Sequence, residues 1–151
     1  MRSPRRSRLV VIGLDEEGRS KAIEHDRTPA RIVRPSGAVV EELWRQESLP
    51  AHPDYDGTHR GEMDPVPPRS GASIRIFTVP ANTPSPPPEE LRSSPSLYVA
   101  TVVSGEAYIV LEAEEVRLRA GDSLVLPGSK HGWRNDAPDP AVLVTTVFAM
   151  E

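Results

Sequence analysis

The second half of the chain is a series of short apolar segments separated by turn residues. Stretches such as SIRIFTV, LYVATVVSG and AVLVTTVFA are rich in β-branched residues and show no helical period. The chain also contains 17 prolines and only 5% aromatic residues. Because proline breaks helix interiors and collects in turns, this pattern predicts an all-β, antiparallel sandwich or barrel rather than a helical bundle.

The first half of the chain has weaker strand signals. SRLVVIGLDEEGRSKAIE predicts a strand, a turn at residues 15–18 and a second strand, and ARIVRPSGAVVEELWRQE repeats this pattern. HPDYDGTHRGEMDPVPPRSG has turn residues throughout, which predicts a long surface loop that acts as a lid or packing arm. We therefore expect a flexible basic tail (1–8) and a single domain (9–151), with a barrel core at about 73–149 and a long loop at about 50–72.

Composition excludes several classes of site. The 151 residues fit one domain, and the absence of cysteine excludes disulfides, thiolate metal sites and cysteine nucleophiles. The net charge of -4 gives no reason to expect a nucleic-acid partner, and the basic run MRSPRRSR is typical of a solvated tail. No apolar run has the length of a secretion signal or a membrane span, so we expect a soluble, cytoplasmic protein.

The stretch GDSLVLPGSKHGWRN carries the most specific motif. The spacing of Gly121, Pro127, Gly128, His131 and Asn135 resembles the second motif of the cupin superfamily, with one residue fewer between proline and glycine. The resemblance is specific over 97–149 and looser over 8–79. It implies a small single-domain cupin: a double-stranded β-helix, or jelly-roll barrel, with an N-terminal strand extension, usually paired as a homodimer.

The same resemblance implies that the metal-binding first motif is degenerate. In cupins that motif normally supplies two histidines and a glutamate, and the corresponding positions here are Arg92, Ser94 and Tyr98. Only His131 remains, and one imidazole cannot hold iron, zinc or manganese at useful affinity. We therefore expect no metal cofactor, although a rearranged site with a histidine of the long loop, or a carboxylate of the proline-rich segment, is the alternative. The other histidines are expected to be solvated loop residues: His25, His52 and His59.

His131 is the first candidate catalytic residue. An imidazole with a pKa near 6.5 accepts and returns protons at neutral pH, and the resemblance implies that its ring points into the barrel mouth. The alternative is a packing role, in which His131 bonds a loop carbonyl beside Trp133. Asn135 is expected to tie down the loop after the motif through its side-chain amide.

Alternation along the strands predicts which residues accompany His131. Tyr98, Ala100 and Val102 are expected to share the inner face, and Arg75 and Phe77 share one face of SIRIFTV. Arg75 is then either an edge residue that reaches water or an arginine aimed at an oxyanion or carboxylate.

Three further side chains have two interpretations each. The guanidinium of Arg92, at a histidine position of the first motif, either replaces the metal electrostatically or is solvated. For Trp44 and Trp133, core packing is the default and ligand stacking is the alternative.

The leading functional hypothesis is a metal-independent cupin enzyme. It would perform proton-transfer chemistry (cyclisation, dehydration, isomerisation or decarboxylation) on an oxygenated, polyketide-like small molecule. The alternatives are a non-catalytic small-molecule-binding cupin and a metal-dependent dioxygenase with atypical ligands. The candidate catalytic residues are His131, Tyr98, Arg92 and Arg75, and the candidate substrate-binding residues are Trp133, Phe77, Ala100, Val102 and Trp44.

The N-terminal strands predict an assembly. SRLVVIGL is apolar enough to require burial, yet the strands of 73–149 already account for most of a small barrel and leave the N-terminal strands without an obvious partner. A free strand edge is a liability unless it is paired. We therefore expect a homodimer in which each N-terminal segment extends the sheet of the other copy.

Overall fold

The computed structural model describes residues 7–27, 29–51 and 63–150, which form antiparallel strands and one short 3-10 turn, η1 (Pro88–Glu90). The all-β jelly-roll prediction is confirmed. No helix in these ranges is long and apolar enough to cross a membrane. The strands are β1 (Leu9–Leu14), β2 (Ser20–Arg27), β3 (Ala30–Val33), β4 (Val39–Gln46), β5 (Ala72–Val79), β6 (Ser96–Ser104), β7 (Glu106–Leu111), β8 (Glu115–Arg119), β9 (Ser123–Leu126), β10 (His131–Arg134) and β11 (Ala141–Ala149).

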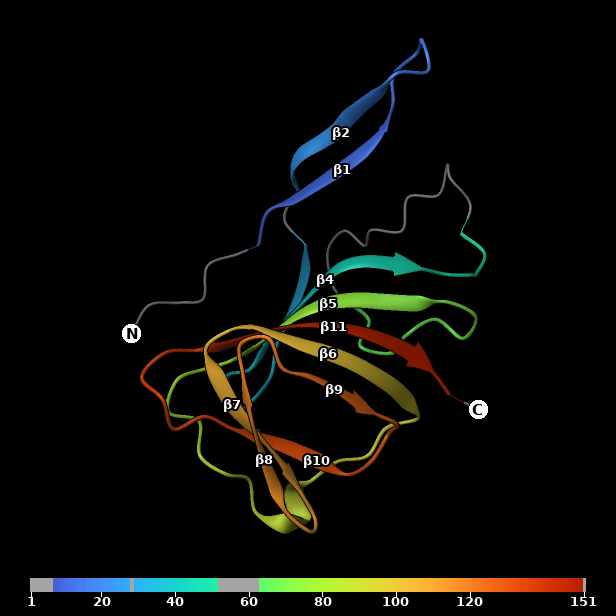
Figure 1. Ribbon diagram of the computed structural model, residues 1–151. Helices are drawn as coiled ribbons and strands as arrows, with labels where there is room; N and C mark the ends of the chain where they lie inside the picture. Colours follow the sequence, from blue (N-terminus) through green and yellow to red (C-terminus); the bar gives the residue numbers. More distant parts are fainter. Residues whose placement is uncertain (1–6, 28, 52–62, 151) are drawn as a thin grey trace.

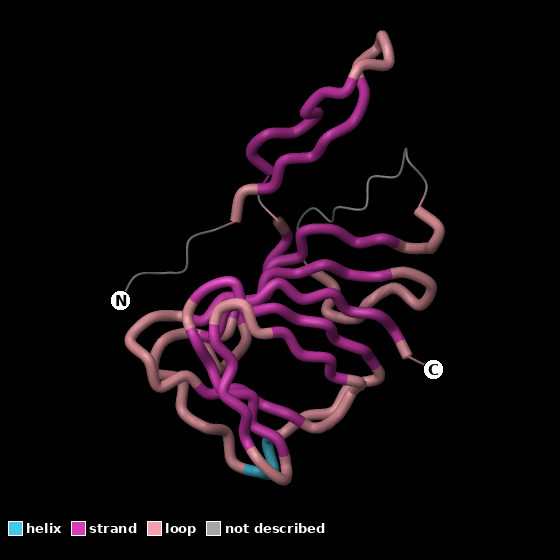
Figure 2. The backbone as a smooth tube through the Cα atoms, in the orientation of Figure 1, coloured by secondary structure: helices cyan, strands magenta, loops and turns pink. Residues whose placement is uncertain are grey.

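Two sheets form the barrel. A six-stranded sheet has the order β3-β4-β5-β11-β6-β9, and a three-stranded sheet has the order β10-β7-β8. Figures 1 and 2 show these sheets as the two walls of the barrel. The core lies between them, because buried residues of both sheets belong to one apolar cluster: Val79, Ala100, Val102, Ala107, Ile109, Leu118, Leu126, Ala141 and Leu143.

Strand register determines which side chains of the large sheet face inward. Phe77 pairs with Leu143, and Leu143 pairs with Val102; Leu143 and Val102 belong to the core cluster and Phe77 packs against it. Because side chains alternate along a strand, the row two residues away also faces inward. That row contains Glu42, Arg75, Thr145 and Ala100.

The N-terminal half contributes two strands to the barrel, so the expectation that its strands lack a partner there is wrong for β3 and β4. β4 pairs with β5 along its length, and β3 pairs with β4. Of the strands that the structure describes, only those of the β1–β2 hairpin stand apart, and the hairpin projects away from both sheets (Figure 1). This hairpin exposes apolar side chains, including Val10, Ile12 and Leu14 on one face of β1.

Residues 63–71, the described end of the expected long loop, pack against the inner side of β3 and β4. Met63 is buried and contacts Ala30 and Val40. Two arginines bind the backbone of this segment: Arg45 Nη1 donates to Val66 O at 2.9 Å, and Arg75 Nη2 donates to Pro65 O at 2.8 Å. Residues 52–62 of the expected loop lie outside the described residues.

Candidate active site

The proline-glycine turn before β10 fixes the position of His131. Gly128 has φ +83°, and a Cβ at this position would lie 2.4 Å from Ser94 O, so the turn requires glycine. Two backbone hydrogen bonds of 3.1 Å then pair His131 with Arg92. The motif therefore anchors the start of β10 on both sides.

The His131 ring is half-buried and has a defined tautomer. Nδ1 lies 3.0 Å from Ser129 O, so Nδ1 carries the hydrogen of the neutral ring and Nε2 has the free lone pair. Burial lowers the pKa of His131 below its ordinary value, and the carbonyls of Ser129 and Arg92 act in the opposite direction. The ring is therefore neutral at pH 7 and competent as a base. The same contact also fulfils the alternative expectation of a bond to a loop carbonyl.

Aromatic side chains from three strands surround this imidazole. The ring centroids of His131 and Tyr98 are 6.2 Å apart, and those of His131 and Trp133 are 6.4 Å apart, both in edge-on arrangements. Phe77 lies 5.5 Å from Trp133. Tyr98, Trp133 and Phe77 all pack against the core cluster. The structure thus brings these four predicted site residues together at the inner side of the barrel wall.

Arg75 lies inside the barrel, so the interpretation of an edge residue that reaches water is wrong. The residue is 4% exposed, and its Nε donates to Ser73 Oγ at 2.8 Å. Burial lowers the pKa of Arg75, while Tyr98 and Glu42 raise it. Arg75 therefore lies within electrostatic reach of the aromatic group around His131.

Sequence reasoning missed three buried polar residues next to Arg75. Glu42 Oε2 accepts a 2.5 Å hydrogen bond from Ser73 Oγ and lies 3.7 Å from Arg45 Nη1. The other oxygen, Glu42 Oε1, is buried and has no hydrogen-bond partner. A usable signal was present, since alternation from the apolar Val40 places Glu42 on the same face of the strand.

Two predicted site residues are not brought to this group. Arg92 is exposed, and its Nη1 donates to Glu89 O at 3.2 Å. Trp44 pairs with Ile74 on the outward face of the large sheet, and its Nε1 donates to Gln46 Oε1. The register shifts between Glu42 and Trp44, so Trp44 does not face inward although it lies two residues after the inward-facing Glu42.

Ala100 and Val102 are core residues. They are 4% and 1% exposed, and they face inward from β6 in the predicted alternation. Asn135 is also buried: its Nδ2 donates to Asp139 O at 2.9 Å and its Oδ1 accepts from the Ala137 N–H at 2.9 Å. This amide closes the loop after the motif.

The residues at the cupin metal positions do not fit a divalent cation. Besides His131, the sequence has Arg92, Ser94 and Tyr98 at these positions, and a guanidinium, a hydroxyl and a phenol are not good ligands for iron, zinc or manganese. Among the described residues no group of three or more histidine and carboxylate side chains is placed to hold a metal. The alternative with a loop histidine stays untested, because His52 and His59 lie outside the described residues and the side chain of His25 is not described.

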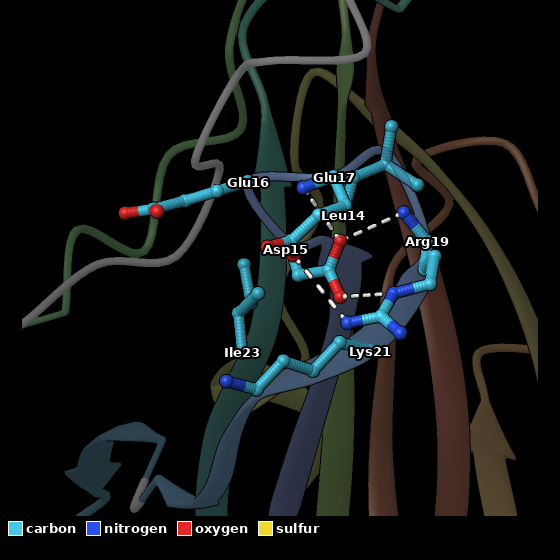
Figure 3. Close-up of a pocket in the computed structure, with 7 residues that line it drawn as sticks. All are labelled: Leu14, Asp15, Glu16, Glu17, Arg19, Lys21 and Ile23. Atoms are coloured by element: carbon cyan, nitrogen blue, oxygen red, sulfur yellow. Dashed lines mark hydrogen bonds and ion pairs between the residues drawn. The ribbon is translucent and has the colours of Figure 1, made fainter.

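A surface hollow lies on the β1–β2 hairpin (Figure 3), and this hairpin projects away from β10 (Figure 1). The hollow is lined by Leu14, Asp15, Glu16, Glu17, Arg19, Lys21 and Ile23. Asp15 accepts hydrogen bonds from the backbone of Glu17 and Arg19 and from Arg19 Nε, and these bonds lower its pKa. The polar groups of the hollow therefore stabilise the hairpin turn, and we assign the candidate site to the barrel.

Comparisons with known proteins give the same fold. A candidate ethanolamine utilization protein Q from Salmonella typhimurium aligns with TM-score 0.56 and 14% identity, covering 98% of this chain and 100% of that chain. The Cnp3 cupin domain of Schizosaccharomyces pombe aligns with TM-score 0.53 and 10% identity, covering 93% of this chain and 86% of that chain. An RmlC-like cupin from Shewanella frigidimarina aligns with TM-score 0.51 and 15% identity, covering 79% of this chain and 82% of that chain. At these identities the likeness shows the fold alone. No curated protein matches the chain.

A family model matches independently of the structure. The model described as "Cupin domain" aligns with residues 75–147, a range that runs from within β5 to within β11 and holds the whole His131 motif. The strand order and the Gly128 turn are consistent with this family match. Residues 75–147 of this chain therefore match the cupin family.

Proposed function

We propose that this cupin domain binds an oxygenated, partly apolar small molecule and moves protons on it with His131. The observation that carries the proposal is the imidazole itself: Nδ1 is engaged by Ser129 O, burial favours the neutral ring, and aromatic side chains surround it. A neutral imidazole in such surroundings is suited to general base catalysis.

The neighbouring residues suggest a division of roles. Phe77 and Trp133 would contact the apolar part of the substrate, and the Tyr98 hydroxyl would donate or accept a hydrogen bond beside His131. The buried guanidinium of Arg75 would stabilise negative charge that develops on a substrate oxygen. These roles suit cyclisation, dehydration, isomerisation or decarboxylation, and a polyketide-like intermediate has the required mixture of carbonyl oxygens and apolar carbon.

No metal is part of the proposal, because the donors around His131 do not fit one. We expect protein purified without a histidine tag to keep its activity after dialysis against EDTA. Stoichiometric iron, nickel or manganese in elemental analysis, together with loss of activity in EDTA, would instead support a dioxygenase with atypical ligands.

The cytoplasmic location of the protein stays a prediction.

Proton transfer is measurable before the natural substrate is known. Deuterium uptake from D₂O into a panel of aromatic and aliphatic ketones, followed by proton NMR, reports removal of a proton from carbon. We expect the wild-type protein to accelerate uptake for at least one ketone, and His131→Gln to lower that rate by about 10²- to 10⁴-fold. Lys130→Ala, an exposed neighbour on the same turn, is the control and should leave the rate unchanged.

Two outcomes would overturn the catalytic role. If His131→Gln unfolds cooperatively and keeps the wild-type rate, His131 is not the base. If ketones shift the melting temperature but exchange no faster than in buffer, the domain is a binding cupin without catalysis.

A further inference from the structure

Glu42 has a buried carboxylate oxygen without a partner. The residue is 1% exposed, and Oε2 is engaged by Ser73 Oγ. Oε1 is fully buried and accepts no hydrogen bond in the described part of the chain. An unpaired buried oxygen is costly, and native proteins usually satisfy such an atom with a ligand or a water molecule. Oε1 therefore keeps an acceptor position that the described residues leave unused.

Glu42 faces the same interior as the proposed active site. It stands opposite Arg75 across β4 and β5, and two residues earlier Val40 stands opposite Phe77. Phe77 packs against Trp133, which is itself next to His131. Side chains of one sheet face at this spacing are neighbours, so Glu42 and Arg75 lie beside the aromatic group on the inner face of the sheet.

The two buried arginines near Glu42 differ in how their charge is balanced. Arg45 has two carboxylates within ion-pair distance, Glu42 at 3.7 Å and Glu47 at 3.0 Å. Among the described residues, Arg75 instead donates hydrogen bonds to two neutral oxygens, Ser73 Oγ and Pro65 O, and the carboxylate of Glu42 acts on it only through its charge. No carboxylate takes the direct hydrogen bonds of Arg75 in the described part of the chain, and arginine binds a carboxylate in a planar, bidentate geometry.

We propose that the ligand of the barrel is a hydroxy acid with an apolar substituent. Its carboxylate faces Arg75, its hydroxyl donates to Glu42 Oε1, and its apolar group lies against Phe77 and Trp133. Glu42 is then a specificity-determining residue that selects a hydroxyl donor. This inference rests on the proposed function only in assigning the ligand to the barrel interior.

Mandelate and phenylacetate form a matched pair of probes. Both carry a phenyl group and a carboxylate, and only mandelate has the α-hydroxyl. Isothermal titration of each enantiomer of mandelate and of phenylacetate, at millimolar concentrations, should show one mandelate enantiomer binding about ten-fold more tightly than phenylacetate. In Glu42→Gln the amide oxygen can keep the bond to Ser73, which places an N–H₂ group where Oε1 was. The preference for mandelate should then fall to within about two-fold.

Glu41→Gln is the control. Glu41 is the adjacent glutamate, equally buried, but it faces outward and accepts hydrogen bonds from Ser7. The Glu41→Gln variant should keep the preference for mandelate over phenylacetate. Equal binding of the two acids by the wild type, binding of neither, or an unchanged preference in Glu42→Gln would each overturn the proposal, provided that circular dichroism shows a folded variant.

The two proposals fail separately. A wild-type preference for mandelate that depends on Glu42, without any deuterium exchange that depends on His131, refutes the catalytic function and keeps the ligand class. Deuterium exchange that depends on His131, without a preference for mandelate, refutes the ligand class and keeps the catalytic function.

Discussion

The charged form of His131 is disfavoured by its own environment. Because burial lowers its pKa in the folded protein, the unfolded chain binds a proton more readily than the folded chain near pH 6. The stabilising contribution of the neutral ring is therefore present above the ordinary histidine pKa and is lost as the pH falls below it.

The lowered pKa of His131 predicts a measurable pH dependence of the free energy of unfolding. Between pH 7 and pH 5 the free energy of unfolding should decrease in the wild type, and the decrease should be smaller in His131→Gln, which has no proton to bind. One proton changes the slope by at most about 1.4 kcal/mol per pH unit. Urea unfolding at several pH values checks this. If the free energy of unfolding changed with pH in the same way in the wild type and in His131→Gln, His131 would have the same pKa in the folded and unfolded chain.

Asn135 connects three backbone groups with one side chain. In Asn135→Ala the buried groups that it satisfies, the Ala137 N–H and the Asp139 carbonyl among them, lose their partner. We expect a loss of about 2–4 kcal/mol in the free energy of unfolding, measured in urea. Asp136→Ala next to it removes only an exposed ion pair with Arg134, so it should cost less than about 1 kcal/mol.

At the scale of elements, two glycines with similar backbone angles test how the His131 turn is built. Gly121 has φ +94° and open space where a Cβ would stand, whereas Gly128 has φ +83° and Ser94 O only 2.4 Å from that position. Gly121→Ala should therefore cost only the strain of a left-handed residue, about 1–2 kcal/mol. Gly128→Ala should cost clearly more in urea unfolding and should shift the His131 ring signals in NMR. Equal costs would show that the backbone around Gly128 adjusts freely.

The elements also show what the sequence can predict. Alternation correctly indicated that Tyr98, Ala100 and Val102 share the inner face, because β6 pairs regularly with β11 over these residues. The size and aromatic character that made Trp44 a candidate for ligand stacking do not tell which side of the strand it occupies, because the irregular register of β4 is set by the partner strand β5 and leaves no local signal.

The buried polar group was missed for a related reason. In EELWRQE the charges of Glu42 and Arg45 look like those of a solvated strand, and only the pairing of β4 with β5 and the contact with residues 63–71 make them buried. Both contacts are distant in sequence. The motif around Gly128 and His131 was readable because its geometry is local.

At the scale of the whole molecule, the β1–β2 hairpin carries several exposed apolar side chains close together. Val10, Ile12 and Leu14 are 39%, 65% and 68% exposed on one face of β1. Apolar side chains on an isolated hairpin gain stability when a second copy covers them, which keeps the predicted homodimer as our expectation.

Sedimentation equilibrium at micromolar concentration should give about twice the chain mass of 16.5 kDa. Ile12→Lys should shift the protein towards monomer, because it places a charge in the covered face. Thr101→Lys, on the barrel surface, is the control and should leave the mass unchanged. A full-length chain that stays monomeric would contradict the arrangement.

Arg45 and Arg75 hold residues 63–71 by the main-chain carbonyls of Val66 and Pro65 rather than by side chains. A carbonyl is present whatever amino acid occupies these positions, and both residues are exposed to solvent. Evolution can therefore change Pro65 and Val66 without loss of these two hydrogen bonds, whereas losing either arginine removes one of them. Among descendants of a common ancestor, positions 65 and 66 should diverge rapidly in sequence while the path of the segment over the barrel stays the same.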